Sequence, residues 1–108
     1  MSHPNVAELN DSSFANFIET ASSPVLVDFW APWCAPCRML GPVVEEVAAE
    51  NVGKYLVAKV NVDDAPGVSA QFGIRSIPTL MYFNGGEKKD QSIGVCSKGE
   101  ILSKLASI

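Results

Sequence analysis

A short apolar segment that leads into two closely spaced cysteines is the feature that most limits how this chain can fold. The segment Val25–Trp30 is apolar except for one acid, a pattern typical of a strand covered on both faces. Cys34 and Cys37 follow it, and apolar residues then recur at helical spacing to about Asn51. The two cysteines are therefore predicted to lie where a buried strand leads into a helix.

That junction makes the two thiols a candidate redox pair. Residues three apart on a helix have Cα atoms roughly 5 Å apart, within the ~4.4–6.8 Å that a disulfide tolerates, so the bond could open and close without refolding. The first thiol would face the positive end of the helix dipole and its unpaired N–H groups, which favour a thiolate. We therefore predict that Cys34 is the nucleophile.

The rest of the chain alternates helix and strand patterns. A strand–helix–strand–helix order favours parallel pairing, and an Asn84–Gly86 turn favours an antiparallel hairpin, so we expect a mixed sheet with helices on both faces. Asn10–Ser12 is predicted to cap the first helix, and Ser97–Glu100 the last. The predicted helices cover 14–21, 34–51, 66–72 and the region of 101–105, and the predicted strands cover 25–30, 56–62, 79–83 and 88–93.

Composition and charge restrict the range of partners and cellular compartments that we expect for this chain. The 108 residues, 47% of them hydrophobic, fit one domain, which we take as 1–108. A net charge of -4, with no basic cluster longer than Lys88–Lys89, argues against nucleic-acid and membrane partners. The chain contains no apolar run of membrane-spanning length, and its start has no signal pattern, so we expect a cytoplasmic protein. An odd number of cysteines, three, is typical of a protein in a reducing compartment with one redox-active pair. Cys96 is then the cysteine outside that pair.

Two sequence motifs then point to a family. With FWAPWCAPCR at 29–38, Lys59 in its strand and GIRSIPT at 73–79, the chain resembles thioredoxins over nearly its whole length. The resemblance implies an α/β thioredoxin fold, a central mixed five-stranded sheet flanked by four helices, and protein disulfide reductase activity. The chain departs from the family's commonest pattern at Ala35, where Gly is usual, and at Cys96. Replacing Gly by Ala would tune the redox potential by only about 10–20 mV.

Four residues are the candidate catalytic groups. Cys34 would form a mixed disulfide with a substrate protein, and Cys37 would then attack that bond and release the substrate. Asp28, an acid in a buried strand, must find a partner or stay protonated, and burial should raise its pKa. By resemblance it lies beneath Cys37 and takes that thiol's proton. Lys59 is the lone charge in the neighbouring strand, and we expect it to pair with Asp28; such a pair could also serve only to hold the strands together.

The expected substrate contacts surround Cys34. Pro36 suits the first turn of a helix and stiffens the loop between the sulfurs. By resemblance, the Ile77–Pro78 peptide bond is cis and leaves the backbone of Ile77 free to bind an extended substrate strand. An apolar rim that accepts varied polypeptides is expected from Pro32, Trp33, Ile77, Gly94 and Val95. Gly94 could equally mark a bulge at the end of a strand.

No nucleotide-binding fingerprint is present, so electrons must come from elsewhere. The resemblance implies a thioredoxin reductase containing flavin or an iron–sulfur cluster as the donor, and disulfide-containing proteins as substrates. We expect a monomer with no cofactor beyond the Cys34–Cys37 disulfide and no metal.

The sequence leaves three alternatives open. A zinc site would need four ligands, and His3 and the three cysteines are the only Cys and His side chains available. A disulfide oxidant or isomerase would suit an exported protein and a more stabilised thiolate. A non-catalytic binding subunit could use the apolar rim around an idle dithiol. Cys96 is interpreted as a small apolar filler rather than a second redox switch.

Overall fold

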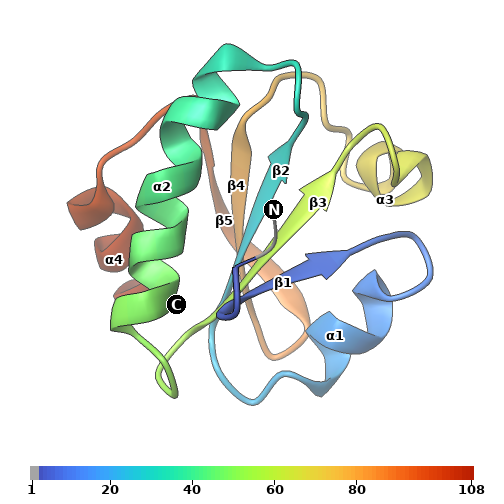
Figure 1. The fold of residues 1–108 in the computed structure, drawn as a ribbon. Helices are drawn as coiled ribbons and strands as arrows, with labels where there is room; N and C mark the ends of the chain where they lie inside the picture. The colour runs from blue at the N-terminus through green and yellow to red at the C-terminus, as the bar shows by residue number, and fades with distance from the viewer. Residues whose placement is uncertain (1–2) are drawn as a thin grey trace.

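The computed structural model describes residues 3–108 and has a five-stranded sheet with helices on both faces (Figure 1). The strands are β1 (Val6–Leu9), β2 (Val25–Trp30), β3 (Leu56–Asn61), β4 (Thr79–Asn84) and β5 (Glu87–Ile93). The helices are α1 (Phe14–Thr20), α2 (Ala35–Glu50), α3 (Pro66–Gln71) and α4 (Lys98–Ser107). This architecture confirms the fold expected from the resemblance.

The strand order is β1-β3-β2-β4-β5, and the sheet is mixed. Strands β1, β3 and β2 pair in parallel, whereas β4 runs antiparallel to β2 and β5 antiparallel to β4. The β4–β5 hairpin turns through Gly85 and Gly86, whose φ angles of 64° and 81° suit glycine and the favoured two-residue turn. The predicted hairpin is therefore confirmed.

Side-chain alternation along the central strands divides the core into two layers. On β2, Val25, Val27 and Phe29 pack with α1 and α3, while Leu26 packs with α2 and α4 on the other face. Asp28 is two residues beyond Leu26 and so belongs to the α2 and α4 face. Both faces of β2 are therefore covered, which explains why its sequence is an almost continuous apolar run.

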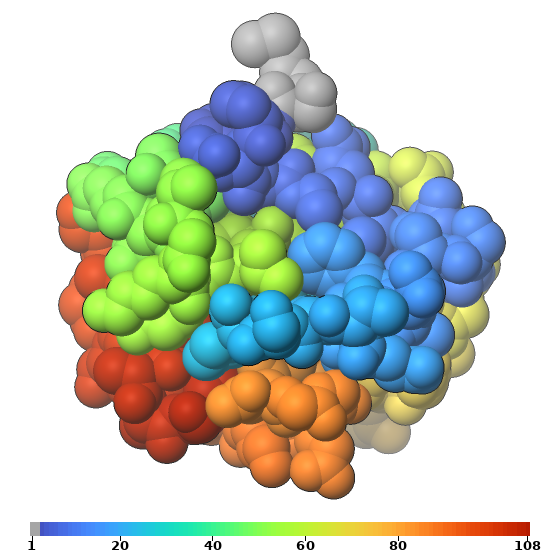
Figure 2. Space-filling view, turned by 90° about the horizontal axis from the view of Figure 1, so that it is seen from below, coloured from blue at the N-terminus to red at the C-terminus, as the bar shows by residue number. Residues whose placement is uncertain are grey.

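The C-terminal end of β2 and the N-terminal end of α2 meet at one end of the sheet (top of Figure 1). Figure 2 shows the opposite end, where the loop after α1, the loop after α2 and the β4–β5 hairpin lie side by side. Among residues 3–108, no helix combines the length and the apolar character needed to cross a membrane.

Two local predictions were incomplete. Strand β1 was not found from the residue pattern, because it is only four residues long and exposes Glu8 between buried ends. The predicted cap of the first helix is confirmed in part: the side chain of Asn10 accepts hydrogen bonds from the N–H groups of Ser12 and Ser13 in the turn that leads into α1, whereas Ser13, the residue directly before α1, makes no side-chain capping bond. The neighbouring Asp11 contacts a different helix.

Candidate active site

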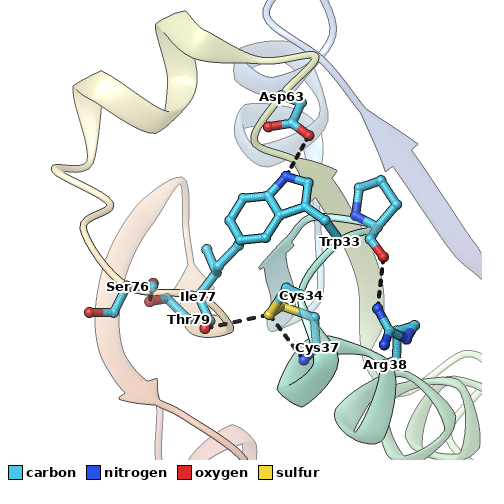
Figure 3. Close-up of a disulfide and its surroundings, with 9 residues drawn as sticks. Trp33, Cys34, Cys37, Arg38, Asp63, Ser76, Ile77 and Thr79 are labelled. Atoms are coloured by element: carbon cyan, nitrogen blue, oxygen red, sulfur yellow. Dashed lines mark hydrogen bonds between the residues drawn. A yellow bond between two sulfur atoms is a disulfide. The ribbon is translucent and has the colours of Figure 1, made fainter.

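The two cysteines lie at the start of α2, as the sequence predicts. Cys34 is the N-cap residue with an extended backbone, and Pro36 occupies the first turn, where a missing N–H costs nothing. A disulfide joins Cys34 to Cys37, with their Cα atoms 5.2 Å apart (Figure 3). Only 5% of Cys34 and 3% of Cys37 is exposed, so the sulfurs can be reached only by a group that enters the surface.

The backbone around Cys34 is arranged to stabilise negative charge on its sulfur. The N–H of Cys37 donates a hydrogen bond to Cys34 Sγ over 3.2 Å, and the end of α2 contributes its dipole. Cys34 Sγ also lies 3.7 Å from the carbonyl oxygen of Ile77, which belongs to the loop before β4 (Figure 3). When the disulfide opens, the same N–H group can stabilise the Cys34 thiolate.

The expected rim residues come from three separate segments. Trp33 is 66% exposed, and its indole lies between Asp63 and Ile77 (Figure 3). Ile77 packs against the two cysteines, and the Ile77–Pro78 peptide bond is cis, as expected. The N–H of Gly94 donates to the carbonyl oxygen of Pro78 over 2.9 Å, which brings the end of β5 to the proline.

Gly94 and Val95 follow β5 directly. Gly94 has a φ of 89°, a conformation that other residues rarely adopt, and Val95 is 50% exposed. The exposed residues Pro32 and Pro36 lie on either side of Cys34 in the chain. The structure thus brings Ile77, Pro78 and Gly94 together beside the sulfurs, with Val95 next in the chain.

Asp28 lies on the face of the sheet that α2 covers, and it shares a cavity of about 240 Å³ with Cys37. Only 4% of the residue is exposed, and within residues 3–108 its Oδ1 atom has no hydrogen-bond partner. Burial raises the pKa of Asp28 to about 7, and the attraction of Lys59 opposes that rise. A carboxyl group that gains and loses a proton near neutral pH therefore opens onto the same space as Cys37.

The predicted direct ion pair between Asp28 and Lys59 is wrong. The two residues are neighbours in the parallel register of β2 and β3, but Lys59 forms no ion pair in the described part of the chain. Its Nζ atom lies 4.8 Å from the centroid of the Trp30 ring. A half-buried lysine keeps its ammonium near water and an aromatic face, and this avoids the cost of desolvating both charges.

Sequence patterns missed two contacts that fix the loop before α2. Trp33 Nε1 donates to Asp63 Oδ2 over 2.9 Å, and Arg38 Nη1 donates to the carbonyl oxygen of Pro32 over 3.0 Å (Figure 3). A basic residue four positions after the first cysteine is one helical turn away from the loop, and that spacing was the available signal.

Cys96 is half-buried and packs against the core beneath α2 and α4. Burial, with a smaller contribution from Glu100, raises the pKa of its thiol. These surroundings fit the interpretation of Cys96 as a small apolar filler. In the part of the chain that the structure describes, no three His, Cys, Asp or Glu side chains gather in a way that could hold a metal ion.

Comparison with known proteins agrees with this geometry. A sequence model of the thioredoxin family matches residues 5–107. The chain is 54% identical over 99 residues to thioredoxin 1 of Nostoc sp., covering 92% of each chain, and 48% identical over 98 residues to a thioredoxin of Synechocystis sp., covering 91% of this chain and 92% of the relative. It is also 46% identical over 100 residues to the chloroplastic thioredoxin M-type of Spinacia oleracea, of which it spans 55%.

The family match covers the segments that form the site, from β2 through the dithiol to the cis proline and the end of β5. The chain therefore belongs to the thioredoxin family, and the thiol–disulfide oxidoreductase activity of that family resides in Cys34 and Cys37.

Proposed function

We propose that this chain is a general protein disulfide reductase. The observation that carries the proposal is the Cys34–Cys37 disulfide at the start of α2, with the N–H of Cys37 on Cys34 Sγ and the Asp28 carboxyl in the adjoining cavity. In the reduced protein, the Cys34 thiolate attacks one sulfur of a substrate disulfide. The other substrate sulfur leaves as a thiolate, and a mixed disulfide remains.

The second step uses Cys37 and Asp28. Cys37 gives its proton to the Asp28 carboxylate, directly or through water in the shared cavity, and then attacks Cys34 Sγ. The bond between Cys34 and the substrate breaks, the second substrate sulfur leaves as a thiolate, and the Cys34–Cys37 disulfide forms again. The substrate gains two electrons, which the protein's dithiol has lost.

The substrate polypeptide would lie across the cis proline. The backbone of Ile77, the exposed Trp33 and the glycine after β5 offer a largely apolar surface beside the sulfurs. An extended segment can bind there through its main chain, so many sequences would be accepted.

Recycling would come from a thioredoxin reductase that contains flavin or an iron–sulfur cluster, because the chain has no nucleotide-binding fingerprint of its own. We further propose that the protein acts as a monomer in the cytoplasm. The net charge of -4 and the small number of cysteines support that proposal.

Substitution of Cys34 by Ser tests the proposed function. Insulin reduction, followed by turbidity in the presence of dithiothreitol or of a reductase with NADPH, should fall to the uncatalysed rate, since no thiolate remains to begin exchange. Cys96→Ser is the matched control, because it also replaces one thiol by a hydroxyl, and it should keep the parent rate. A parent protein that does not accelerate insulin reduction would refute the proposal and favour a binding subunit.

A further inference from the structure

A row of three charges with alternating sign crosses the sheet beside the dithiol. Glu8 of β1 lies beside Lys59 of β3 in the parallel register, and Lys59 lies beside Asp28 of β2. Because side chains alternate along strands, residues two positions apart share a face. The residues two positions before these three all belong to the core beneath α2 and α4: Val6, Val57 and Leu26. All three charges are therefore on the face that carries the dithiol helix.

Exposure increases along this row, and two cavities meet in its middle. Asp28 is buried, Lys59 is half-buried and Glu8 is exposed. The inner cavity, of about 240 Å³, contains Asp28 and Cys37, and an outer cavity of about 320 Å³ contains Glu8. Trp30 and Lys59 line both cavities. Lys59 is thus the charged group that can carry an electrostatic effect from Glu8, in the outer cavity, to Asp28, in the inner one.

The ammonium group of Lys59 is not held by either acid. It lies against the Trp30 ring, and within residues 3–108 it takes part in no ion pair. A carboxylate on each side attracts it. Movement toward Glu8 takes positive charge away from Asp28 and makes the Asp28 carboxylate harder to form, whereas movement toward Asp28 does the opposite.

We propose that Glu8 is a positioning residue for the exchange reaction: its charge attracts the Lys59 ammonium toward the outer cavity, and so keeps the Asp28 carboxyl ready to take the Cys37 proton at neutral pH. The inference rests on the proposed function of Asp28 as the base of the second step. A base works best when its pKa is near the working pH. Stronger pairing with Lys59 would lower the pKa of Asp28 and so make it a weaker base at neutral pH.

Other charged groups around this row do not change the sign of the effect. The negative charge of Glu8 also disfavours the Asp28 carboxylate directly, which is the same direction. The further titratable or charged groups that line the two cavities or act on Asp28 are Cys37, Arg38 and Glu45 of α2, Asp64 before α3, and Cys96 before α4.

The test begins with Glu8→Gln, which removes the charge at nearly constant shape from an exposed position. Carbon NMR of the Asp28 carboxyl in the oxidised protein gives its titration midpoint. Rapid-quench release of a peptide from its mixed disulfide with Cys34 gives the pH midpoint of the second step. Both midpoints should fall by roughly half a pH unit or more, because the loss of the Glu8 charge and the return of Lys59 toward Asp28 both favour the Asp28 carboxylate.

Two variants control for charge and chemistry. Glu8→Asp keeps the charge and should keep both midpoints near the parent values. Glu19→Gln makes the same change in net charge on α1, across the sheet, and should move neither midpoint. An equal shift in Glu19→Gln would overturn the inference, because the effect would then be one of net charge alone.

Removing the lysine tests the route. In a Lys59→Met background, or in Lys59→Gln as a second uncharged variant, Glu8→Gln should shift the Asp28 midpoint by less than half of its effect in the parent. A full shift without Lys59, no shift in the parent background, or an upward shift would each overturn the inference. Absence of insulin reduction by the parent protein would refute the proposed function instead, while the NMR titration would still decide the role of Glu8 at Asp28.

Discussion

One buried carboxyl links the stability of the fold to its chemistry. Asp28 is 4% exposed, and burial raises its pKa from 3.8 to about 7 against the attraction of Lys59. Between these two values the folded protein binds a proton that the unfolded chain has released. Stability therefore falls as the pH rises from about 4 to about 7, and the full penalty is present above that range.

Asp28→Asn should remove this penalty. We expect the free energy of unfolding to rise by up to on the order of 4 kcal/mol at pH 8, and by little near pH 4, where the carboxyl is neutral in the folded protein and only partly ionised in the unfolded chain. Urea unfolding of the oxidised protein at pH 4, 6 and 8 measures the difference. A gain of equal size at all three values would show that the titration of Asp28 is not its source.

The same variant should lose speed in the second exchange step, because an amide cannot accept the proton of Cys37. The mixed disulfide with a peptide substrate should accumulate, while the first attack by Cys34 keeps its rate. If neither step changes with any exchange partner, Asp28 is a structural residue only.

The role of a single residue could be predicted where that residue lies in a regular strand or helix pattern. Asp28 was identified because it interrupts an apolar strand, and Cys34 and Cys37 because of their spacing at the start of a helix. The bond of Trp33 to Asp63 joins two loop residues, and the bond of Arg38 joins helix α2 to the loop residue Pro32. Loops have no repeating pattern that tells where a side chain will find its partner, so these contacts required the structure.

At the scale of elements, a residue between β1 and α1 holds the start of α3. The carboxylate of Asp11 accepts hydrogen bonds from the N–H groups of Gly67 over 3.0 Å and of Val68 over 2.8 Å. A Cβ atom on Gly67 would lie 3.0 Å from that carboxylate, so the glycine leaves the room that the contact needs. Asp11 thus caps a helix more than fifty residues away in the chain.

Asp11→Ala should lower the free energy of unfolding by about 1–2 kcal/mol, the usual cost of losing a helix cap. Asp11→Asn keeps one acceptor oxygen and should lose less. Urea unfolding of the three proteins under the same redox conditions gives the order parent, Asn variant, Ala variant. Equal stability of the Ala variant and the parent would mean that the capping bonds contribute nothing in solution.

Elements were predictable in proportion to the regularity of their sequences. The strand β2, the long helix α2 and the β4–β5 hairpin follow clear apolar periods or turn signals. Ser97 also caps α4 as predicted, through the N–H of Glu100, whereas the Glu100 carboxylate points to Ser92. Of the cap residues predicted at Asn10–Ser12, Asn10 binds the turn that leads into α1, whereas Asp11 caps α3. The same residue types suit a turn, a near helix or a distant one, and only tertiary contact selects among them.

For the molecule as a whole, the Cys34–Cys37 bond closes a very short loop, with a sequence separation of 3. Constraining so short a loop in the unfolded chain stabilises the folded state by about 2 kcal/mol. We expect urea unfolding at pH 7 to show a loss of about that size on reduction with dithiothreitol. Cys96→Ser should show the same loss, since Cys96 has no part in the bond. A reduced protein as stable as the oxidised one would contradict this expectation.

Because both sulfurs are nearly buried, the structure also limits which substrate proteins, or clients, can be reduced. With 5% and 3% of the two cysteines exposed, the protein cannot reach into a partner, and the partner's own sulfur must come to it. A rigid client whose crosslink is enclosed in its interior will be spared until that region opens. The order in which clients are reduced will therefore follow their local breathing motions more closely than their sequences.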